Sequence, residues 1–301
     1  MTPPRIFDLN WTGRPRSIGS ALLESAGVRA LIDPGPSSTL PTLRAHLQSH
    51  GLTVQDLDTI LLTHIHLDHA GAAGSLVREN PRLSVYVHER GAPHMADPAK
   101  LLGSAARLYA DKMQQLYGDF LPVPRENLRE LRGGESISIG DRALQVLYTP
   151  GHASHHVTFW DPSDHTAYVG DTAGICVEGD SFILPAVPPP DIDLEIWHHS
   201  LDEILKLQPQ RLFLTHFGFA DRPAEHIAHY RERMRGWCDL AERLLRENQN
   251  GNAAQKFVEE TAAEIRRAHT GPEAEHYIFN GGLLLSWLGL ERYLRKRAAA
   301  K

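Results

Sequence analysis

Cysteine is scarce in this chain of 301 residues, which holds only Cys176 and Cys238. Two cysteines are too few for a disulfide framework, and their separation does not match the short spacings of a cysteine-based metal site. The sequence therefore excludes both kinds of scaffold. We expect the two thiols to be small buried side chains.

Long hydrophobic runs and an excess of positive charge are also missing. No segment reaches the length of a transmembrane helix, and residues 1–5 are not followed by the apolar core of a signal peptide. The formal net charge is −6, so the overall charge favours neither a nucleic acid nor an anionic membrane as a partner. We expect a cytoplasmic protein that acts on a small molecule; whether it is a monomer or a homodimer stays open.

Histidine, by contrast, is abundant, with 18 copies. Hydrophobic residues make up 42% of the chain and charged residues 23%, which is the profile of a soluble globular protein. The length suits one large domain or one domain with an appendage. The histidines therefore have to be judged by their positions along such a fold.

The densest group of histidines lies between Thr59 and Gly71. The apolar run 60–62 suits a buried strand. Four potential metal ligands follow it within six residues: His64, His66, Asp68 and His69. Alternate residues of an extended segment point to one side, which predicts that the first three share a face and that the chain turns at His69. Clustered imidazoles and carboxylates suit zinc or iron.

Short strands and turns are predicted over most of the first 220 residues. Apolar or alternating runs favour strands at 20–23, 29–32, 60–62, 83–87, 136–139, 143–148, 157–160, 166–169 and 211–214. The spacing of Leu40, Leu43 and Leu47 predicts a helix over 39–50. Strands and helices thus alternate, as in an α/β protein.

Residues 91–132 interrupt the strand pattern. Apolar side chains recur there at helical intervals until Pro122 and Pro124 close the segment. We predict a helical insertion, whose aromatic and sulfur side chains either line a pocket or form the buried face of a helix. Tyr109, Met113 and Tyr117 are the candidates for a substrate pocket.

Helical patterns dominate the end of the chain. Asp193 is the expected N-cap of a helix over 194–207. Further helices are predicted at 223–249, 253–268 and 272–297. Residues 222–301 are therefore predicted to be a C-terminal helical extension.

Three more candidate ligands each follow the end of a predicted strand. His152 ends the stretch Thr-Pro-Gly-His, Asp171 stands in Gly-Asp-Thr and His216 in Thr-His-Phe-Gly. Strand ends are held rigidly, while the loops beyond them can converge on a site. Four strand ends that carry histidine or aspartate indicate one shared metal centre.

These elements, in this order, resemble the metallo-β-lactamase superfamily and its H-x-H-x-D-H signature. The resemblance implies an α/β (α+β) fold, an αββα four-layer sandwich of two mixed sheets with helices outside. The catalytic domain would span 1–221, with the helical insertion at about 91–132, and 222–301 would be the helical extension.

The resemblance also implies a binuclear metal site. One ion would be held by the residues His64, His66 and His152, a second by Asp68, His69 and His216, and Asp171 would bridge both. The ions would be zinc, with iron or manganese as alternatives. Two ions about 3.5–4 Å apart lower the pKa of a shared water towards 7, so that a bridging hydroxide becomes the nucleophile.

Three neighbours of this set have expected supporting roles. The loop at Asp33 lies close to the metals in the superfamily, so Asp33 either orients a ligand histidine or forms a plain turn. His156 is expected to support the ligands from behind, and His155 to be exposed. Asp68 has a second possible role as a general base or acid if only one metal binds.

The predicted function is that of a metal-dependent hydrolase of a small ester, thioester or lactone, resembling glyoxalase II-like enzymes. No clear glutathione-binding signature accompanies the motifs. A phosphodiesterase of the same fold is one alternative. Another is a persulfide dioxygenase-like enzyme, in which His64, His152 and Asp171 would hold a single iron. A domain kept only for binding would have lost ligands, and none is lost.

Overall fold

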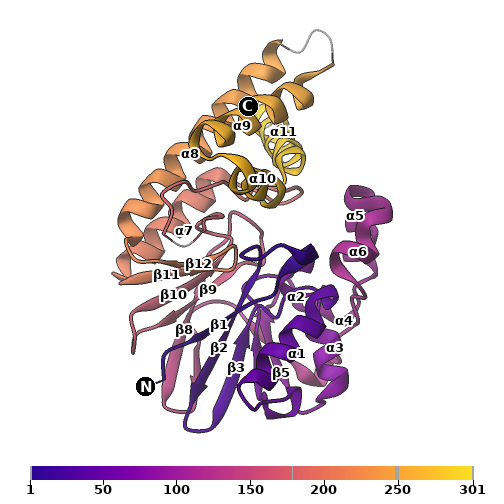
Figure 1. The fold of residues 1–301 in the computed structure, drawn as a ribbon, viewed down its shortest axis with the longest axis vertical. Helices are drawn as coiled ribbons and strands as arrows, with labels where there is room; N and C mark the ends of the chain where they lie inside the picture. The colour runs from indigo at the N-terminus through magenta and orange to yellow at the C-terminus, as the bar shows by residue number, and fades with distance from the viewer. Residues whose placement is uncertain (1, 178, 248–250, 300–301) are drawn as a thin grey trace.

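The computed structural model describes residues 2–177, 179–247 and 251–299, and in it two six-stranded sheets lie face to face (Figure 1). The first sheet has the order β1 (Arg5–Asp8), β2 (Gly19–Ser25), β3 (Val28–Ile32), β4 (Thr59–Leu61), β5 (Ser84–His88) and β6 (Leu128–Leu131). The second has the order β12 (Gly218–Ala220), β11 (Arg211–Leu214), β10 (Thr166–Gly170), β9 (Val157–Asp161), β8 (Arg142–Tyr148) and β7 (Ser136–Ile139).

Both sheets are mixed, as predicted. In the first sheet β1, β2 and β3 are antiparallel neighbours, while β3, β4, β5 and β6 run parallel. In the second sheet β10 and β11 are parallel and the other neighbours are antiparallel. The parallel strands matter for the site, because their carboxyl ends reach the same edge.

Alternation along the strands divides the core into layers. On β3, Leu31 packs outward against helices, whereas Ala30 and Ile32 face the second sheet. On β11, Phe213 lies between the sheets and its two neighbours pack outward. Successive strand side chains point to opposite faces, so both faces of each sheet are covered, which gives the αββα sandwich.

Helices cover the outer faces of the two sheets. On the first sheet these are α1 (Leu40–Ser49) and α3 (Ala73–Glu79), whose buried leucines join the core outside that sheet. On the second sheet, α7 (Leu194–Lys206) buries Trp197 and Leu201. The side chain of Asp193 accepts a hydrogen bond of 3.1 Å from the backbone N–H of Ile196, which confirms the predicted N-cap.

The insertion between β5 and β6 is only partly helical. It contains α4 (Ala92–Ala96), α5 (Ala99–Tyr109) and α6 (Met113–Tyr117). The predicted insertion of about 91–132 extends too far at its C-terminal end, because residues 128–131 form β6 and pair with β5. Arg129 and Glu130 at its centre are exposed, so this short edge strand lacks the apolar run that identifies a strand in sequence.

The C-terminal helices are α8 (Pro223–Glu247), α9 (Ala253–Ala268), α10 (Gly271–Asn280) and α11 (Leu283–Ala299). The single helix predicted at 272–297 is thus two helices, separated at Gly281-Gly282, where Gly282 has a φ of +49°. Trp237, Phe257 and Trp287 from these helices share one core with the outer face of the second sheet. Among the described residues, no helix is long and apolar enough to cross a membrane.

Candidate metal centre

The candidate ligands stand where strands of both sheets end. The loop after β4 carries His64 and His66, and His152, Asp171 and His216 follow β8, β10 and β11. The short helix α2 (Leu67–Ala70) begins directly after His66. The prediction that the extended segment includes residue 68 is therefore wrong, because the carbonyl of His66 accepts hydrogen bonds from the N–H groups of His69 and Ala70 and closes a helical turn.

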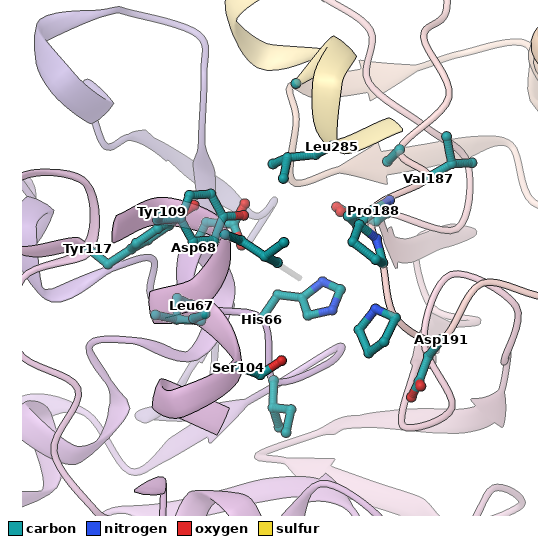
Figure 2. Close-up of a pocket in the computed structure, with 18 of the residues that line it drawn as sticks. His66, Leu67, Asp68, Ser104, Tyr109, Tyr117, Val187, Pro188, Asp191 and Leu285 are labelled. Atoms are coloured by element: carbon teal, nitrogen blue, oxygen red, sulfur yellow. The ribbon is translucent and has the colours of Figure 1, made fainter. Parts of the chain in front are cut away.

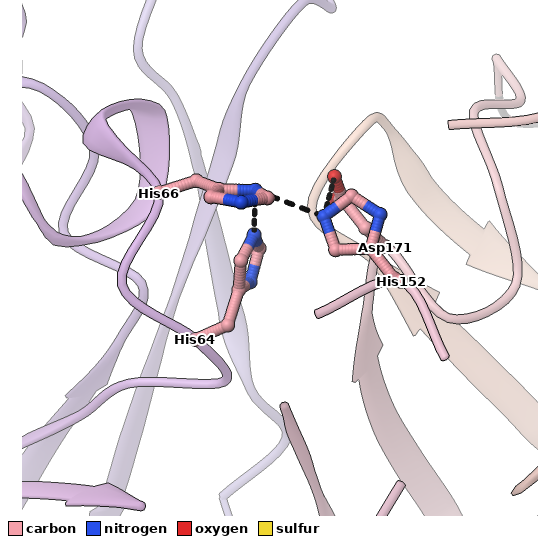
Figure 3. Close-up of side chains that lie close together, drawn as sticks. All are labelled: His64, His66, His152 and Asp171. Carbon is pink, nitrogen blue, oxygen red and sulfur yellow. Dashed lines mark hydrogen bonds and ion pairs between the residues drawn. The ribbon is translucent and has the colours of Figure 1, made fainter. Parts of the chain in front are cut away.

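Three histidines and one aspartate form the first ligand group (Figure 3). The Nε2 atoms of His64 and His152 each lie 2.9 Å from Nδ1 of His66. Oδ2 of Asp171 lies 3.4 Å from Nε2 of His152. These ligand atoms all lie within 4.8 Å of one another, a spacing that suits a shared ion.

Hydrogen bonds on the far side of the rings fix which nitrogens face the cluster. Nδ1 of His152 donates to the carbonyl of Ala186 at 2.8 Å. Nδ1 of His64 lies 3.1 Å from the hydroxyl of Thr63, which itself donates to Asp33. Both Nε2 atoms therefore present lone pairs to the same space, and His66 has at most one proton to offer there. Such a set of converging lone pairs favours a cation.

The second ligand group consists of Asp68, His69 and His216. Oδ2 of Asp68 lies 3.4 Å from Nε2 of His216. Nδ1 of His216 donates to the carbonyl of Ser17 at 2.6 Å. Its Nε2 therefore also faces the cluster.

Asp171 lies between the two groups and turns one oxygen towards each. Its Oδ2 faces His152, while its Oδ1 lies 3.1 Å from Nε2 of His69 and 3.6 Å from Nε2 of His216. One carboxylate can therefore serve two ions. The arrangement is that of the predicted bridging ligand.

Asp33 supports the second group from below. Its Oδ2 accepts a hydrogen bond of 2.8 Å from Nδ1 of His69 and another of 2.9 Å from the hydroxyl of Thr215. The backbone N–H and the hydroxyl of Thr63 donate to its two oxygens at 2.8 and 2.7 Å. Of the two roles open to Asp33, the orienting one is therefore present in the structure.

Nε2 of His69 and Oδ1 of Asp171 are buried at the centre and neither makes a hydrogen bond, although the two atoms lie 3.1 Å apart. Unpaired buried polar atoms are costly and rare in native proteins. A divalent ion between the groups would satisfy both, so the residues fit a metal on structural grounds.

The electrostatics differ between the two groups. Burial, together with neighbouring histidines, lowers the pKa of His66 to about 3 and also lowers the pKa values of His64 and His152. These rings are therefore neutral at pH 7, with one N–H each. Burial opposes a charge on His69 and His216 as well, but the carboxylates of Asp171 and Asp68 outweigh it and raise both pKa values.

Asp68 and Asp171 are the negative counterparts of this pattern. Burial alone would raise the pKa of each carboxyl. His69 and His216 outweigh burial, so the pKa of Asp68 falls to about 2 and that of Asp171 falls well below its ordinary value. Both side chains are carboxylates at neutral pH, the form in which they bind cations.

His156 and Gly170 hold the Asp171 loop in place. Nδ1 of His156 lies 3.1 Å from the hydroxyls of Thr149 and Thr172, and its Nε2 accepts a 3.4 Å contact from the N–H of Asp171. His156 thus has the supporting position expected for it. Gly170 has a φ of +49°, and a Cβ there would lie 2.5 Å from the hydroxyl oxygen of Thr63. Only glycine fits this approach.

A cavity of about 480 Å³ opens above the centre (Figure 2). His66, Asp68, Asp171 and His216 line its floor. Most of its walls come from three separate parts of the chain: the insertion (residues 100–117), the loop 186–191 and the turn between α10 and α11 (residues 279–286). The site is therefore a pocket with the ligand clusters at its base.

The predicted pocket residues have different outcomes. Tyr109 and Tyr117 line the cavity, as expected. Met113 does not, and packs instead against the core outside the first sheet. His155, expected to be exposed, is half-buried and lines the pocket. Met113 stands at the first position of α6, and its packing against that core accounts for its absence from the lining.

Comparison with known proteins agrees with this geometry. A model of the metallo-beta-lactamase superfamily matches residues 13–216, more than half of the chain. The chain belongs to the metallo-β-lactamase superfamily. All the candidate ligands lie within the matched segment.

Several members of the superfamily are similar in sequence. The metallo-beta-lactamase fold-containing protein ST1585 of Sulfurisphaera tokodaii is 29% identical over 165 residues, 54% of this chain and 61% of that protein. A hydroxyacylglutathione hydrolase of Legionella pneumophila is 30% identical over 149 residues, 49% of this chain and 43% of the enzyme. The chain thus matches about half of the length of these relatives.

Solved structures of superfamily members share the fold. The crystal structure of ST1585 aligns with a TM-score of 0.66 at 20% identity and covers 97% of this chain and 99% of its own. A di-iron-bound structure, TTHA1623, aligns with a TM-score of 0.52 at 31% identity and covers 68% and 89%. The first comparison includes the C-terminal helices, so the extension also occurs in another member.

Some residues of this superfamily site could not be found from the sequence. The carbonyls of Ser17 and Ala186 orient two ligand histidines, and main-chain groups leave no mark on residue type. Phe279 and Leu285 reach the pocket from the extension. Their helical spacing is that of any buried helix face, so no signal distinguished them.

Proposed function

We propose that the protein is a binuclear metal-dependent hydrolase of small carboxylic esters, thioesters or lactones. Two divalent ions, zinc by preference and iron or manganese otherwise, would be held at the base of the pocket. The first would lie among His64, His66, His152 and Asp171, and the second among Asp68, His69, His216 and Asp171.

One observation carries this proposal. Asp171 turns separate oxygens towards two groups of ligands, at 3.4 Å from His152 and 3.1 Å from His69. A single-ion site would need only one of these groups. Nε2 of His69 and Oδ1 of Asp171 are buried without a hydrogen bond. Burying such polar atoms is costly unless a partner such as a cation compensates for the loss of water.

The bound ions would supply a water of lowered pKa and polarise the substrate's carbonyl oxygen. The chain supplies position and proton control. His64, His152 and His216 are held by hydrogen bonds to their outer nitrogens, so their orientation is fixed before substrate arrives.

Two side chains that line the pocket, Asp68 and Tyr109, can exchange a proton or donate a hydrogen bond. Asp68 lines the pocket and is only partly buried. With a single ion bound, its carboxylate is free to accept a proton and return it to the leaving group. Burial and the nearby Asp68 raise the pKa of Tyr109 to about 12, so its phenol keeps its proton and can donate a hydrogen bond to a substrate oxygen.

The substrate class is supported by relatives and by charge. Related enzymes named hydroxyacylglutathione hydrolase occur in Legionella and Xylella. The net charge of −6 gives no electrostatic support for binding a polyanion. A small neutral or singly charged ester, thioester or lactone fits this balance better than a phosphodiester of a nucleic acid.

Metal reconstitution combined with a substrate panel tests the proposal. The metal-free protein is loaded with zinc, manganese or iron(II) and assayed on a thioester, a lactone and a phosphodiester. We expect hydrolysis of the first two, abolished by chelation and almost abolished by His64→Ala or His66→Ala. Turnover of the phosphodiester alone, or consumption of oxygen with a persulfide by a single-iron protein, would overturn it.

A further inference from the structure

One side of the pocket is a continuous aromatic wall, formed by Trp11, Tyr109, Tyr117 and Phe279. The ring centroids of Trp11 lie 5.8 Å from Tyr117 and 5.5 Å from Phe279, and those of the two tyrosines are 4.9 Å apart. These are the distances of packed aromatic pairs. The wall is therefore a joined surface rather than scattered rings.

The wall is held in place by its own contacts. The indole N–H of Trp11 donates to the carbonyl of Leu116 at 2.6 Å, tying the loop after β1 to α6. Trp11 and Tyr117 are only 8% and 5% exposed. Val187 and Leu285 continue the apolar surface across the opening above His66 (Figure 2). A rigid apolar surface loses little entropy when it binds an apolar group.

Another part of the pocket lining is polar and exposed to solvent. It includes Arg90, Lys100 and Asp191. The hydroxyl of Ser154 donates to Asp191 at 2.8 Å. His155 also lines the pocket, with its ring centroid 5.7 Å from that of His66. A charged or strongly hydrated group is accommodated here without burial.

We propose that the substrate is an ester or thioester with a long apolar acyl chain, which lies along the aromatic wall. This inference rests on the proposed hydrolase function. Hydrolysis joins the oxygen of water to the acyl carbon and breaks the C–O or C–S bond, whose electron pair leaves with the departing oxygen or sulfur. That atom takes up one proton of the water, the other proton passes to solvent, and the acid is released as carboxylate. The alcohol or thiol part of the substrate faces the polar, exposed part of the lining.

Burial against the wall sets the expected selectivity. A buried methylene is worth about 0.8 kcal/mol, which corresponds to about a fourfold gain in kcat/KM per added carbon. The cavity of about 480 Å³ is in the range that holds small ligands whole. Between acetyl and hexanoyl esters of one alcohol, we therefore expect a rise of about two hundredfold before the gain levels off.

Two neighbouring leucines provide a matched pair of variants. Leu285 lines the pocket, whereas Leu284 is 54% exposed on the same helix. Leu285→Trp fills the space beside the wall and should lower the hexanoyl-to-acetyl ratio of kcat/KM by at least tenfold. Leu285→Ala removes apolar contact without placing a larger side chain in the pocket, and it should lower the hexanoyl-to-acetyl ratio of kcat/KM several-fold. Leu284→Trp should keep the ratio of the unmodified protein.

The metal-loaded protein and its variants are assayed on 4-nitrophenyl esters from acetyl to octanoyl. A flat profile with good acetyl turnover overturns the inference and leaves the hydrolase intact. If no ester is hydrolysed, the thioester and lactone assays decide the proposed function, and calorimetry with octanoate and acetate decides the inference separately. Octanoate binding at least tenfold tighter than acetate, and lost in Leu285→Trp, supports the wall; equal binding refutes it.

Discussion

Replacing Asp33 by asparagine tests how the second ligand group is oriented. The carboxylate is fully buried and accepts hydrogen bonds of 2.7 to 2.9 Å from Thr63, Thr215 and His69. Asparagine keeps the size but has one accepting oxygen and an NH₂ group that only donates. In either orientation of the amide, that NH₂ group faces a buried donor.

The magnitude of the effect follows from this mismatch. One or more buried donors lose their acceptor, which costs about 1–3 kcal/mol of the free energy of unfolding. His69 also loses its charged acceptor. Partners of this kind contribute about 10–100-fold to metal affinity, or about 1.4–2.7 kcal/mol. The larger loss should fall on the ion held by Asp68, His69 and His216, because Asp33 accepts a hydrogen bond directly from His69 and reaches the first group only through the hydroxyl of Thr63 beside His64.

Competitive titration against a coloured chelator measures the two affinities. We expect Asp33→Asn to bind the second ion about 10–100-fold more weakly and to lose clearly less affinity for the first ion. Asp202→Asn is the matched control, because it makes the same change at a carboxylate whose side chain is 55% exposed on α7. Unchanged binding of both ions, or an equal loss of both, would refute the orienting role.

Three further perturbations follow from the same geometry. Because the pKa values of His69 and His216 are raised, both rings hold an extra proton in the metal-free protein below those values. Binding of the second ion should therefore release protons and become tighter as the pH rises. Calorimetry in two buffers of different ionisation enthalpy measures the proton release, and its absence contradicts the assignment. Gly170→Ala forces a positive φ on alanine and should cost at least about 1–2 kcal/mol, seen as a lower denaturation midpoint; an unshifted midpoint counts against the close packing. Tyr109→Ala and Tyr117→Ala should change the order of substrate preference while leaving metal content intact, and kinetics unchanged across a substrate panel would return both tyrosines to packing roles.

The sandwich and the grouping of the candidate ligands could be predicted because both depend on residue type. Apolar runs mark most strands, and the ligands follow four of them directly. The exact ends of the elements around the site were harder to predict from the sequence. The extended segment predicted through Asp68 ends at His66, because a helical turn closes there. Strand β6 was missed because its pairing with β5 needs only backbone groups.

The sequence did not reveal how the pocket walls are assembled. The aromatic wall joins residues 11, 109, 117 and 279, which are far apart in the chain and meet only after both sheets and the extension have packed. No local pattern encodes such a contact. No sequence pattern identifies Arg90 and Asp191 as part of the pocket rim either, since charged surface residues are common.

Elemental analysis of the metal-loaded protein is the most direct test of the central claim. We expect about two divalent ions per chain in the unmodified protein. His152→Ala and His216→Ala each remove a ligand from one group only, so each should retain about one ion. A single ion per chain in the unmodified protein under metal excess, or variants that both keep two, would contradict the shared binuclear centre.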